Sequence, residues 1–286
     1  MNSESAGFEV EFDHVAIALE RMTDGWTVFS DGLGGRYIDR GITDGYSWLQ
    51  LKFANGFKLE TLHPEENSEP PTGSHGAFVQ RFLRRRGPGP HHLTFVVDDL
   101  DAAMASLSDA GLTPGTVDRS ETQWQEALYG AAQAHGIILQ VAQRDESLRP
   151  EQAGPPQGPP EGLVEPPFDH PMGSLSRVVH AVADIEGALT VYRDALGGTV
   201  HSSGAAVDGN HWAELGWNGA GRLRLLEATH GDLADWIGDR PGRLRHLYFS
   251  FDDPQLVPDA HKVAESRWAI SNDSLGVRIV LASTAR

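Results

Sequence analysis

The sequence predicts an α+β protein built from four βαβββ units that pair into two domains. Three observations support this fold class. A short apolar strand followed by a helical segment recurs four times, two of these strands open with a histidine at the same place, and a proline-rich stretch divides the chain near its middle. An internal repeat is a stronger indication of fold than the propensity of any single element, so the repeat decides the fold class.

The first two units show the pattern most clearly. The first begins with an apolar strand at residues 15–18 and continues into a helix at 22–33, which Gly34 ends. The second begins with a strand at 93–97 and continues into a helix at 100–107, which Gly111 ends. Further strands are predicted at the following segments: 48–53 and 57–62 in the first unit, and 136–142 in the second.

The second half of the chain repeats the arrangement. A strand at 178–182 leads into a helix at 185–196, and a strand at 247–251 leads into a segment around 256–263. Later strands are expected at 222–227 and 276–281. An aspartate before three of the four helical segments can accept the first backbone N–H bonds, and a glycine after a helix supplies its left-handed cap.

A proline-rich stretch sets the domain boundary. Eight prolines lie in residues 145–171, which excludes a helix or a central strand and favours an extended spacer. We therefore expect a first domain at 8–145, a linker at 146–172 and a second domain at 173–286.

Composition excludes several classes of protein. No run of about 18 apolar residues is present, so a membrane span is not expected, and the polar N-terminus lacks the features of a signal peptide. We therefore expect a cytoplasmic protein. The net charge of −17 disfavours nucleic acid and membrane surfaces as partners. Cysteine is absent, so any metal site must use His, Asp, Glu, Gln or water.

Four polar side chains interrupt apolar strands at matched places of the first two units. His14 and His92 open the first strands, and Glu60 and Gln140 lie in the last strands. If the two units pair about a pseudo-twofold axis, these side chains converge in one cleft. Two imidazoles with a carboxylate and an amide oxygen suit Zn, Mn, Fe, Co or Ni better than Ca. His91 neighbours His92, but adjacent strand residues face opposite sides, and the match to His14 selects His92.

Ordinary structural roles compete with this interpretation. Glu60 could be the polar face of a strand, paired with Lys58, and Gln140 could face solvent. The two-copy symmetry favours the metal site, because structural roles do not predict it. In the second half we match Arg177, Glu227, His246 and Val280 to the four positions. We expect a degenerate copy without a metal there, with a metal-free binding pocket as the alternative.

The first half resembles the vicinal oxygen chelate superfamily, which includes glyoxalase I, extradiol dioxygenases, bleomycin-resistance proteins and methylmalonyl-CoA epimerase. The resemblance is carried by residues 12–18 (FDHVAIA), 82–100 (FLRRRGPGPHHLTFVVDDL) and 135–140 (HGIILQ), and is nearest to the epimerase branch. A weaker resemblance lies at residues 182–198 (VADIEGALTVYRDALGG). The resemblance to this superfamily implies two paired glyoxalase-like domains and a divalent metal held by His14, Glu60, His92 and Gln140.

The sequence departs from the epimerase pattern in two places. In the epimerases the second ligand is usually glutamine and the fourth is glutamate, whereas here these positions are Glu60 and Gln140. Gln50 stands where the epimerases carry a glutamate that acts as a base. Since an amide cannot abstract a proton, Glu60 becomes the candidate base. We assign substrate binding to Trp48 on a strand, to Gln50, and to Trp124 in a loop, although core packing explains the two tryptophans equally well. Arg84, Arg85 and Arg86 could meet a phosphate, but a solvated helix end explains them better.

Three functional classes remain open on the sequence. The first is a metal-dependent isomerase, epimerase or lyase that stabilises an enolate or vicinal oxygens of a small carbonyl or thioester substrate. The second is an extradiol-type dioxygenase, and the third is a non-catalytic small-molecule binding or resistance protein. The partner in each case is a small molecule, and a homodimer is left open.

Overall fold

The computed structural model describes residues 7–43, 45–64, 77–145 and 158–284. They form two eight-stranded sheets, with the strand orders β2-β3-β4-β1-β5-β8-β7-β6 and β10-β11-β12-β9-β13-β16-β15-β14. Each order is the same permutation, so each sheet joins two βαβββ units through their first strands. The expected α+β fold of four paired βαβββ units is confirmed.

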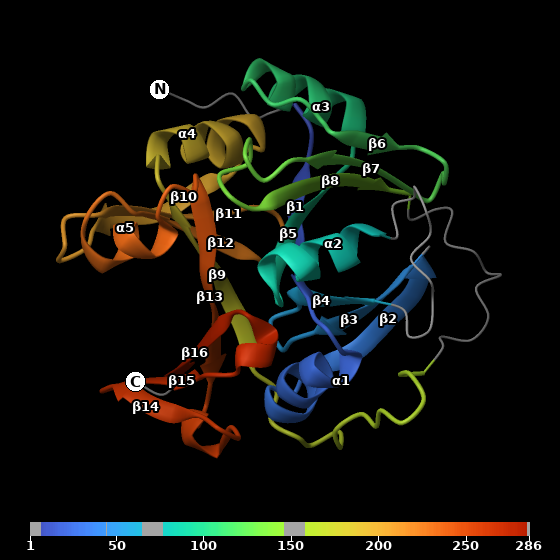
Figure 1. Cartoon of the computed structure of the whole chain (residues 1–286), viewed down its shortest axis with the longest axis vertical. Helices are drawn as coiled ribbons and strands as arrows, with labels where there is room; N and C mark the ends of the chain where they lie inside the picture. The colour runs from blue at the N-terminus through green and yellow to red at the C-terminus, as the bar shows by residue number, and fades with distance from the viewer. Residues whose placement is uncertain (1–6, 44, 65–76, 146–157, 285–286) are drawn as a thin grey trace. The chain divides into compact units, whose positions relative to one another are not determined.

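The first sheet contains units one and two, joined by the helix α2. Its elements are β1 (Val10–Ala18), α1 (Met22–Gly25), the π-helical η1 (Trp26–Gly32), β2 (Arg36–Thr43), β3 (Tyr46–Lys52), β4 (Lys58–Pro64), α2 (Ala77–Arg86), β5 (Gly89–Val97), α3 (Leu100–Asp109), β6 (Thr116–Asp118), β7 (Trp124–Tyr129) and β8 (Ile138–Arg144). Figure 1 shows α3 lying alongside β6, β7 and β8.

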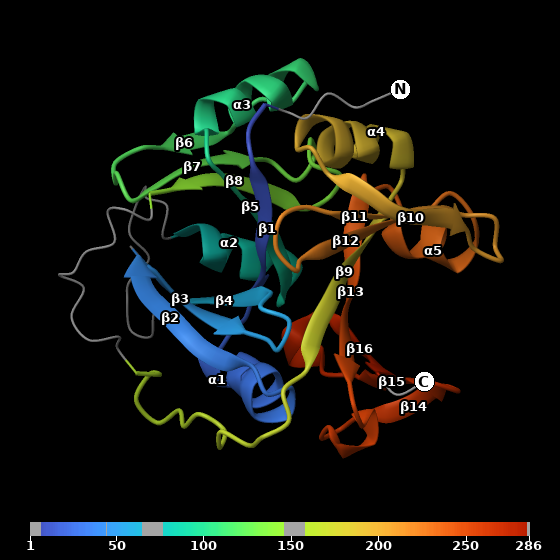
Figure 2. The same ribbon diagram turned by 180° about the vertical axis from the view of Figure 1, so that it is seen from behind.

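The second sheet contains units three and four. Its elements are β9 (Ser174–Val182), α4 (Ile185–Leu189), the π-helical η3 (Thr190–Ala195), β10 (Thr199–Ala205), β11 (His211–Gly216), β12 (Arg222–Glu227), α5 (Gly231–Ile237), β13 (Gly242–Phe251), the 3₁₀ turn η4 (Pro254–Leu256), β14 (His261–Ala264), β15 (Arg267–Ile270), η5 (Asp273–Leu275) and β16 (Arg278–Ser283). Figure 2 shows α4 and α5 beside β10, β11 and β12.

Helix starts follow the expected capping chemistry. Asp99 accepts a hydrogen bond from the Ala102 N–H, and Asp184 accepts one from the Gly187 N–H. In the fourth unit the helical segment expected around 256–263 is wrong, because Asp253 caps only the single 3₁₀ turn η4 and the chain then continues into β14. Proline at the first position allows the turn to start, but too few residues separate it from the next strand for a longer helix.

In each sheet, the helix between the first and second βαβββ units packs its apolar side chains on the strands. Helix α2 packs Val79 and Leu83 against Ala16, Ala18 and Leu62. Ala16 and Ala18 lie two and four residues after His14 on β1, so their side chains are on the same face of the sheet as His14. Helix α2 therefore covers one end of the sheet face that carries His14. Helix α5 makes the corresponding contact, through the following set: Leu233 and Ile237 against Ala181, Ala228 and Leu226.

By contact density the chain also divides into two compact parts, which are not the same as the βαβββ units. One comprises residues 1–13, 92–151 and 177–245, and the other comprises 14–91, 152–176 and 246–286. The expected bounds of 8–145 and 173–286 follow the two sheets instead, and they remain a prediction.

The linker expected at 146–172 lies partly outside the described residues, which resume at 158. From there to residue 173 the chain forms no helix or strand. The Arg36 guanidinium holds this stretch by donating to the backbone carbonyls of Pro166, Pro167 and Phe168. No helix in the described part of the chain is long and apolar enough to cross a membrane.

Candidate metal centre

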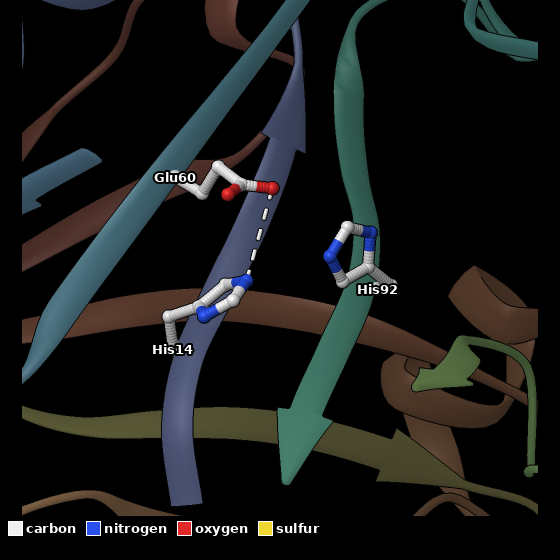
Figure 3. Close-up of side chains that lie close together, drawn as sticks. All are labelled: His14, Glu60 and His92. Atoms are coloured by element: carbon white, nitrogen blue, oxygen red, sulfur yellow. Dashed lines mark ion pairs between the residues drawn. The ribbon is translucent and has the colours of Figure 1, made fainter. Parts of the chain in front are cut away.

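Three of the four expected ligands lie together. The ligand atoms of His14, Glu60 and His92 are all within 4.8 Å of one another, and the three side chains point toward a common point in Figure 3. The His14 Nε2 and Glu60 Oε1 atoms are 3.7 Å apart. The three residues are 2%, 8% and 5% exposed. A carboxylate and two imidazoles buried to this degree require a partner that compensates their lost hydration.

Strand pairing explains why these positions match. In the parallel pair β1–β4, Glu60 lies opposite Ala16, two residues after His14. In the parallel pair β5–β8, Gln140 lies opposite Thr94, two residues after His92. Because side chains alternate along a strand, a separation of two keeps each pair on one face of the sheet. The register therefore gives His14 with Glu60, and His92 with Gln140, equivalent places in the two units.

The donor set fits a divalent transition metal. Imidazole nitrogen and carboxylate oxygen bind such ions at about 2.0–2.2 Å, which places the ligand atoms roughly 3–4 Å apart. The distance of 3.7 Å between His14 Nε2 and Glu60 Oε1 lies in that range, and all three ligand atoms lie within 4.8 Å of one another. Two histidines with one carboxylate also leave coordination positions open for substrate oxygens.

Gln140 occupies the fourth expected position, with its amide bonded on both sides. Its Oε1 accepts a hydrogen bond from the Thr94 hydroxyl at 2.5 Å, and its Nε2 donates to Glu126 Oε2 at 2.5 Å. The side chain is 9% exposed, so it does not simply face solvent. Its role as the fourth ligand remains a prediction.

Glu126 is a candidate functional residue that the sequence analysis missed. Residues 121–126 were expected to form a loop, but Trp124 and Glu126 lie in β7, where their side chains share a face with Leu128. Leu128 pairs with Gln140, so this face is the one that carries the candidate ligand. The Trp124 indole donates to Glu126 Oε2 at 2.7 Å. The sequence offers only a weak signal for this strand, the alternation of Ala127 and Tyr129 with Glu126 and Leu128.

Gln50 and Trp48 lie on β3, beside the site. Gln50 pairs with Glu60 across β3–β4, and its Nε2 donates to Glu60 Oε2 at 2.9 Å. Trp48 pairs with Leu62 and packs in the apolar cluster beneath α2. Gln50 therefore orients the carboxylate, whereas Trp48 forms part of the wall next to it. Substrate binding by Trp48, Gln50 and Trp124 remains a prediction.

His92, rather than its neighbour His91, belongs to the cluster. The His91 ring packs against the rings of Phe78 and Phe82, with centroids 5.0 and 4.9 Å apart. Burial in this aromatic surrounding lowers the pKa of His91 to about 3. The three arginines of the last turn of α2 are exposed, which agrees with a solvated helix end: Arg84, Arg85 and Arg86.

The second sheet carries a different set of residues at the corresponding places. In the β9–β12 pair, Arg224 lies opposite Val179, two residues after Arg177. Arg224, and not Glu227, is therefore the counterpart of Glu60. The predicted match of Glu227 to Glu60 is wrong. It rested on the Leu-Glu dipeptide that is present at both places, and this likeness shifts the alignment by three residues. Glu227 lies at the end of β12 and bonds His211.

Comparison with known proteins agrees with this architecture. A family model described as a glyoxalase-like domain matches residues 12–176. The chain belongs to this glyoxalase-like family, and its fold places it in the vicinal oxygen chelate superfamily. No curated protein sequence matches the chain.

Solved structures are similar over nearly the whole chain. A variant of 4-hydroxymandelate synthase from Streptomyces coelicolor has 14% identity and a TM-score of 0.58, covering 98% of this chain and 94% of its own. A halotolerant catechol dioxygenase has 12% identity and a TM-score of 0.55, with 96% and 86% covered. Methylmalonyl-CoA epimerase from Mycobacterium tuberculosis has 23% identity over 52% of this chain and 94% of its own, with a TM-score of only 0.39. At these identities the likeness concerns the fold alone, and nearness to the epimerase branch remains a prediction.

Proposed function

We propose that the protein is a metal-dependent enzyme of the isomerase, epimerase or lyase type that acts on a small carbonyl or thioester substrate. The cluster of His14, Glu60 and His92 is the observation that supports this proposal. A divalent ion held there would act as a Lewis acid and stabilise negative charge that develops on substrate oxygens.

The surrounding residues have distinct parts in this proposal. His14 and His92 bind the ion through neutral imidazoles, and Glu60 supplies the anionic ligand. Gln140 is the proposed fourth ligand and would supply its Oε1, the atom that accepts the Thr94 hydroxyl hydrogen bond in this structure. The Gln50 N–H bond to Glu60 Oε2 fixes the plane of the carboxylate, as residues behind metal ligands commonly do.

Proton transfer is assigned to Glu60, with Glu126 as the other carboxylate on the same face of the sheet. A base must reach the substrate proton within hydrogen-bond distance. Glu126 accepts bonds from Gln140 and Trp124 through one oxygen, Oε2. Comparing Glu60→Gln with Glu126→Gln at a metal concentration that saturates both variants separates the two assignments, because under that condition only loss of the base abolishes turnover.

A second candidate is an iron-dependent, ring-cleaving dioxygenase. Two histidines with one carboxylate are the donor set of non-haem iron oxygenases, and this composition is the specific observation in its favour. Oxygen consumption with catechols by anaerobically iron-loaded protein would select this activity over the first. Retention of a ligand without metal or turnover would select a binding protein.

Metal analysis of protein purified without a histidine tag tests the metal centre. We expect one tightly bound divalent ion per chain, lost in His14→Ala and His92→Ala, and held at least about tenfold more weakly in Glu60→Gln. His261→Ala, which changes an exposed histidine on β14, is the control and keeps the metal. Equal metal content in all of these proteins would exclude the site, and circular dichroism establishes that each variant is folded.

A further inference from the structure

The second sheet carries a pair of arginines where the first sheet carries metal ligands. By strand register, Arg177 corresponds to His14 and Arg224 corresponds to Glu60. The neighbouring positions also correspond, since Glu214 lies opposite Arg224 as Gln50 lies opposite Glu60. The same place in the fold has therefore exchanged nitrogen and oxygen ligands for guanidinium groups.

The two guanidinium groups converge on one carboxylate oxygen. Arg177 Nη1 lies 3.0 Å from Glu214 Oε2, and Arg224 Nη2 lies 2.9 Å from the same atom. Arg224 Nε also donates to it, at 3.1 Å. Two guanidinium groups therefore share one carboxylate oxygen, in a chain whose net charge is −17.

An indole ring supports one of the arginines. The Arg224 guanidinium carbon lies 4.4 Å from the centre of the Trp212 ring, which is a stacking distance. The neighbouring strand leaves room for this ring, because Gly204 lies opposite Trp212 on the same face and a Cβ there would come within 3.2 Å of the indole. Stacking reduces the freedom of the guanidinium and fixes the direction of its N–H groups.

Stability alone is a weak reason for this arrangement. The side chains of Arg177, Arg224 and Glu214 are 25%, 29% and 16% exposed, and ion pairs that reach solvent contribute little to folding. The same exposure makes the guanidinium groups accessible to a ligand. Arginine forks match the geometry of carboxylate and phosphate oxygens, and Glu214 already demonstrates that the pair accepts a carboxylate.

We propose that Arg177, Arg224 and Trp212 form an oxyanion-binding site in the second sheet, which holds a carboxylate or phosphate group of a small molecule. Glu214 is the internal anion that keeps the two guanidinium groups together when no ligand is bound. This site does not depend on the metal centre of the first sheet.

Isothermal titration calorimetry of the full chain, with malonate and separately with inorganic phosphate in a buffer free of other small oxyanions, tests the proposal. We expect saturable binding that is weakened at least about tenfold in Arg177→Met and in Arg224→Met, because each loses a charge-assisted fork. Glu214→Gln removes the competing charge and should tighten binding severalfold. Arg222→Met is the matched control, since Arg222 lies on the same strand and its guanidinium donates to the backbone carbonyls of Gly219 and Gly221.

The two titrations distinguish a carboxylate ligand from a phosphate ligand. Tighter malonate binding identifies a carboxylate ligand, and tighter phosphate binding identifies a phosphate ligand. The absence of saturable binding of both anions, or equal affinity in the wild type and the two arginine variants, overturns the proposal. If an arginine variant does not fold, unchanged affinity in Glu214→Gln overturns it instead. Metal content is measured in parallel and is expected to stay constant, so failure here is distinct from failure of the metal centre.

Discussion

Glu60 shows how its immediate neighbours determine the chemistry open to a carboxylate. One oxygen faces His14, and the other accepts the Gln50 amide N–H. A glutamate at position 50 would place two carboxylates side by side, which disfavours ionisation of both. The amide avoids this repulsion and suits a carboxylate ligand at Glu60. The departure at Gln50 is thus coupled to the presence of glutamate at position 60.

Replacing Gln50 tests this coupling. Gln50→Met removes the donor to Glu60 Oε2 at similar volume, so we expect metal affinity to fall about tenfold while the fold is retained. Competition with a chromophoric chelator measures the affinity. Lys52→Met, an exposed change two residues further along β3, is the control. An unchanged affinity in Gln50→Met would mean that Glu60 does not need this partner.

At the scale of elements, α2 is the part that most directly supports the site. Its buried residues Val79 and Leu83 pack on Ala16 and Leu62, each two residues from a candidate ligand. The packing fixes the strands that hold His14 and Glu60, and it covers the apolar part of the same sheet face. This helix is amphipathic in sequence, but nothing in its own composition says which sheet face it covers.

Truncation of the buried face of α2 should be costly. Leu83→Ala leaves a cavity in this cluster, and we expect the free energy of unfolding to fall by about 2–3 kcal/mol. Arg84→Ala, on the exposed face of the same helix, should change it by less than about 0.5 kcal/mol. Chemical denaturation of both variants measures the difference. Equal stabilities would show that α2 is not packed on the sheet.

Sequence patterns predicted the elements unevenly. The caps at Asp99 and Asp184 are local, so the residues themselves indicated the helix starts. The sequence predicts a loop at Trp124, whereas this residue opens β7, because the polar residues of this strand obscure its two-residue alternation. The fourth helix was expected by analogy with the other units, although the short connection to β14 leaves room only for η4.

At the scale of the whole molecule, buried histidines such as His63 and His180 link stability to pH. Burial lowers the pKa of His63 to about 4 and that of His180 to about 4, from 6.5. His63 lies between the hydroxyls of Ser47 and Thr61, and His180 Nε2 lies 2.7 Å from the His135 carbonyl oxygen. Neither has a carboxylate among these contacts to stabilise an added proton.

The protein should therefore lose stability as pH falls from about 6.5 to 4. Between pH 6.5 and 4 the two imidazoles are protonated in the unfolded chain but stay neutral in the folded protein. Their contribution to stability is therefore complete above pH 6.5 and is lost progressively toward pH 4. Each histidine contributes up to about 3 kcal/mol to this loss. Denaturation curves at several pH values measure it. His63→Gln should flatten the profile by about one proton, whereas His261→Gln, an exposed change, should leave it as it is.

The sequence by itself determined the repeat, the α+β class and the matched polar positions His14, Glu60, His92 and Gln140, because apolar periodicity and repeated motifs are local properties of the chain. Only the tertiary structure decided which side chains meet. Strand register brought Gln50 to Glu60 and Glu126 to Gln140. Register also made Arg224, rather than Glu227, the counterpart of Glu60. The shift of three residues between Glu227 and Arg224 moves the side chain to the other face of the strand and changes its partners, and the pairing of strands that are distant in the sequence fixes this register.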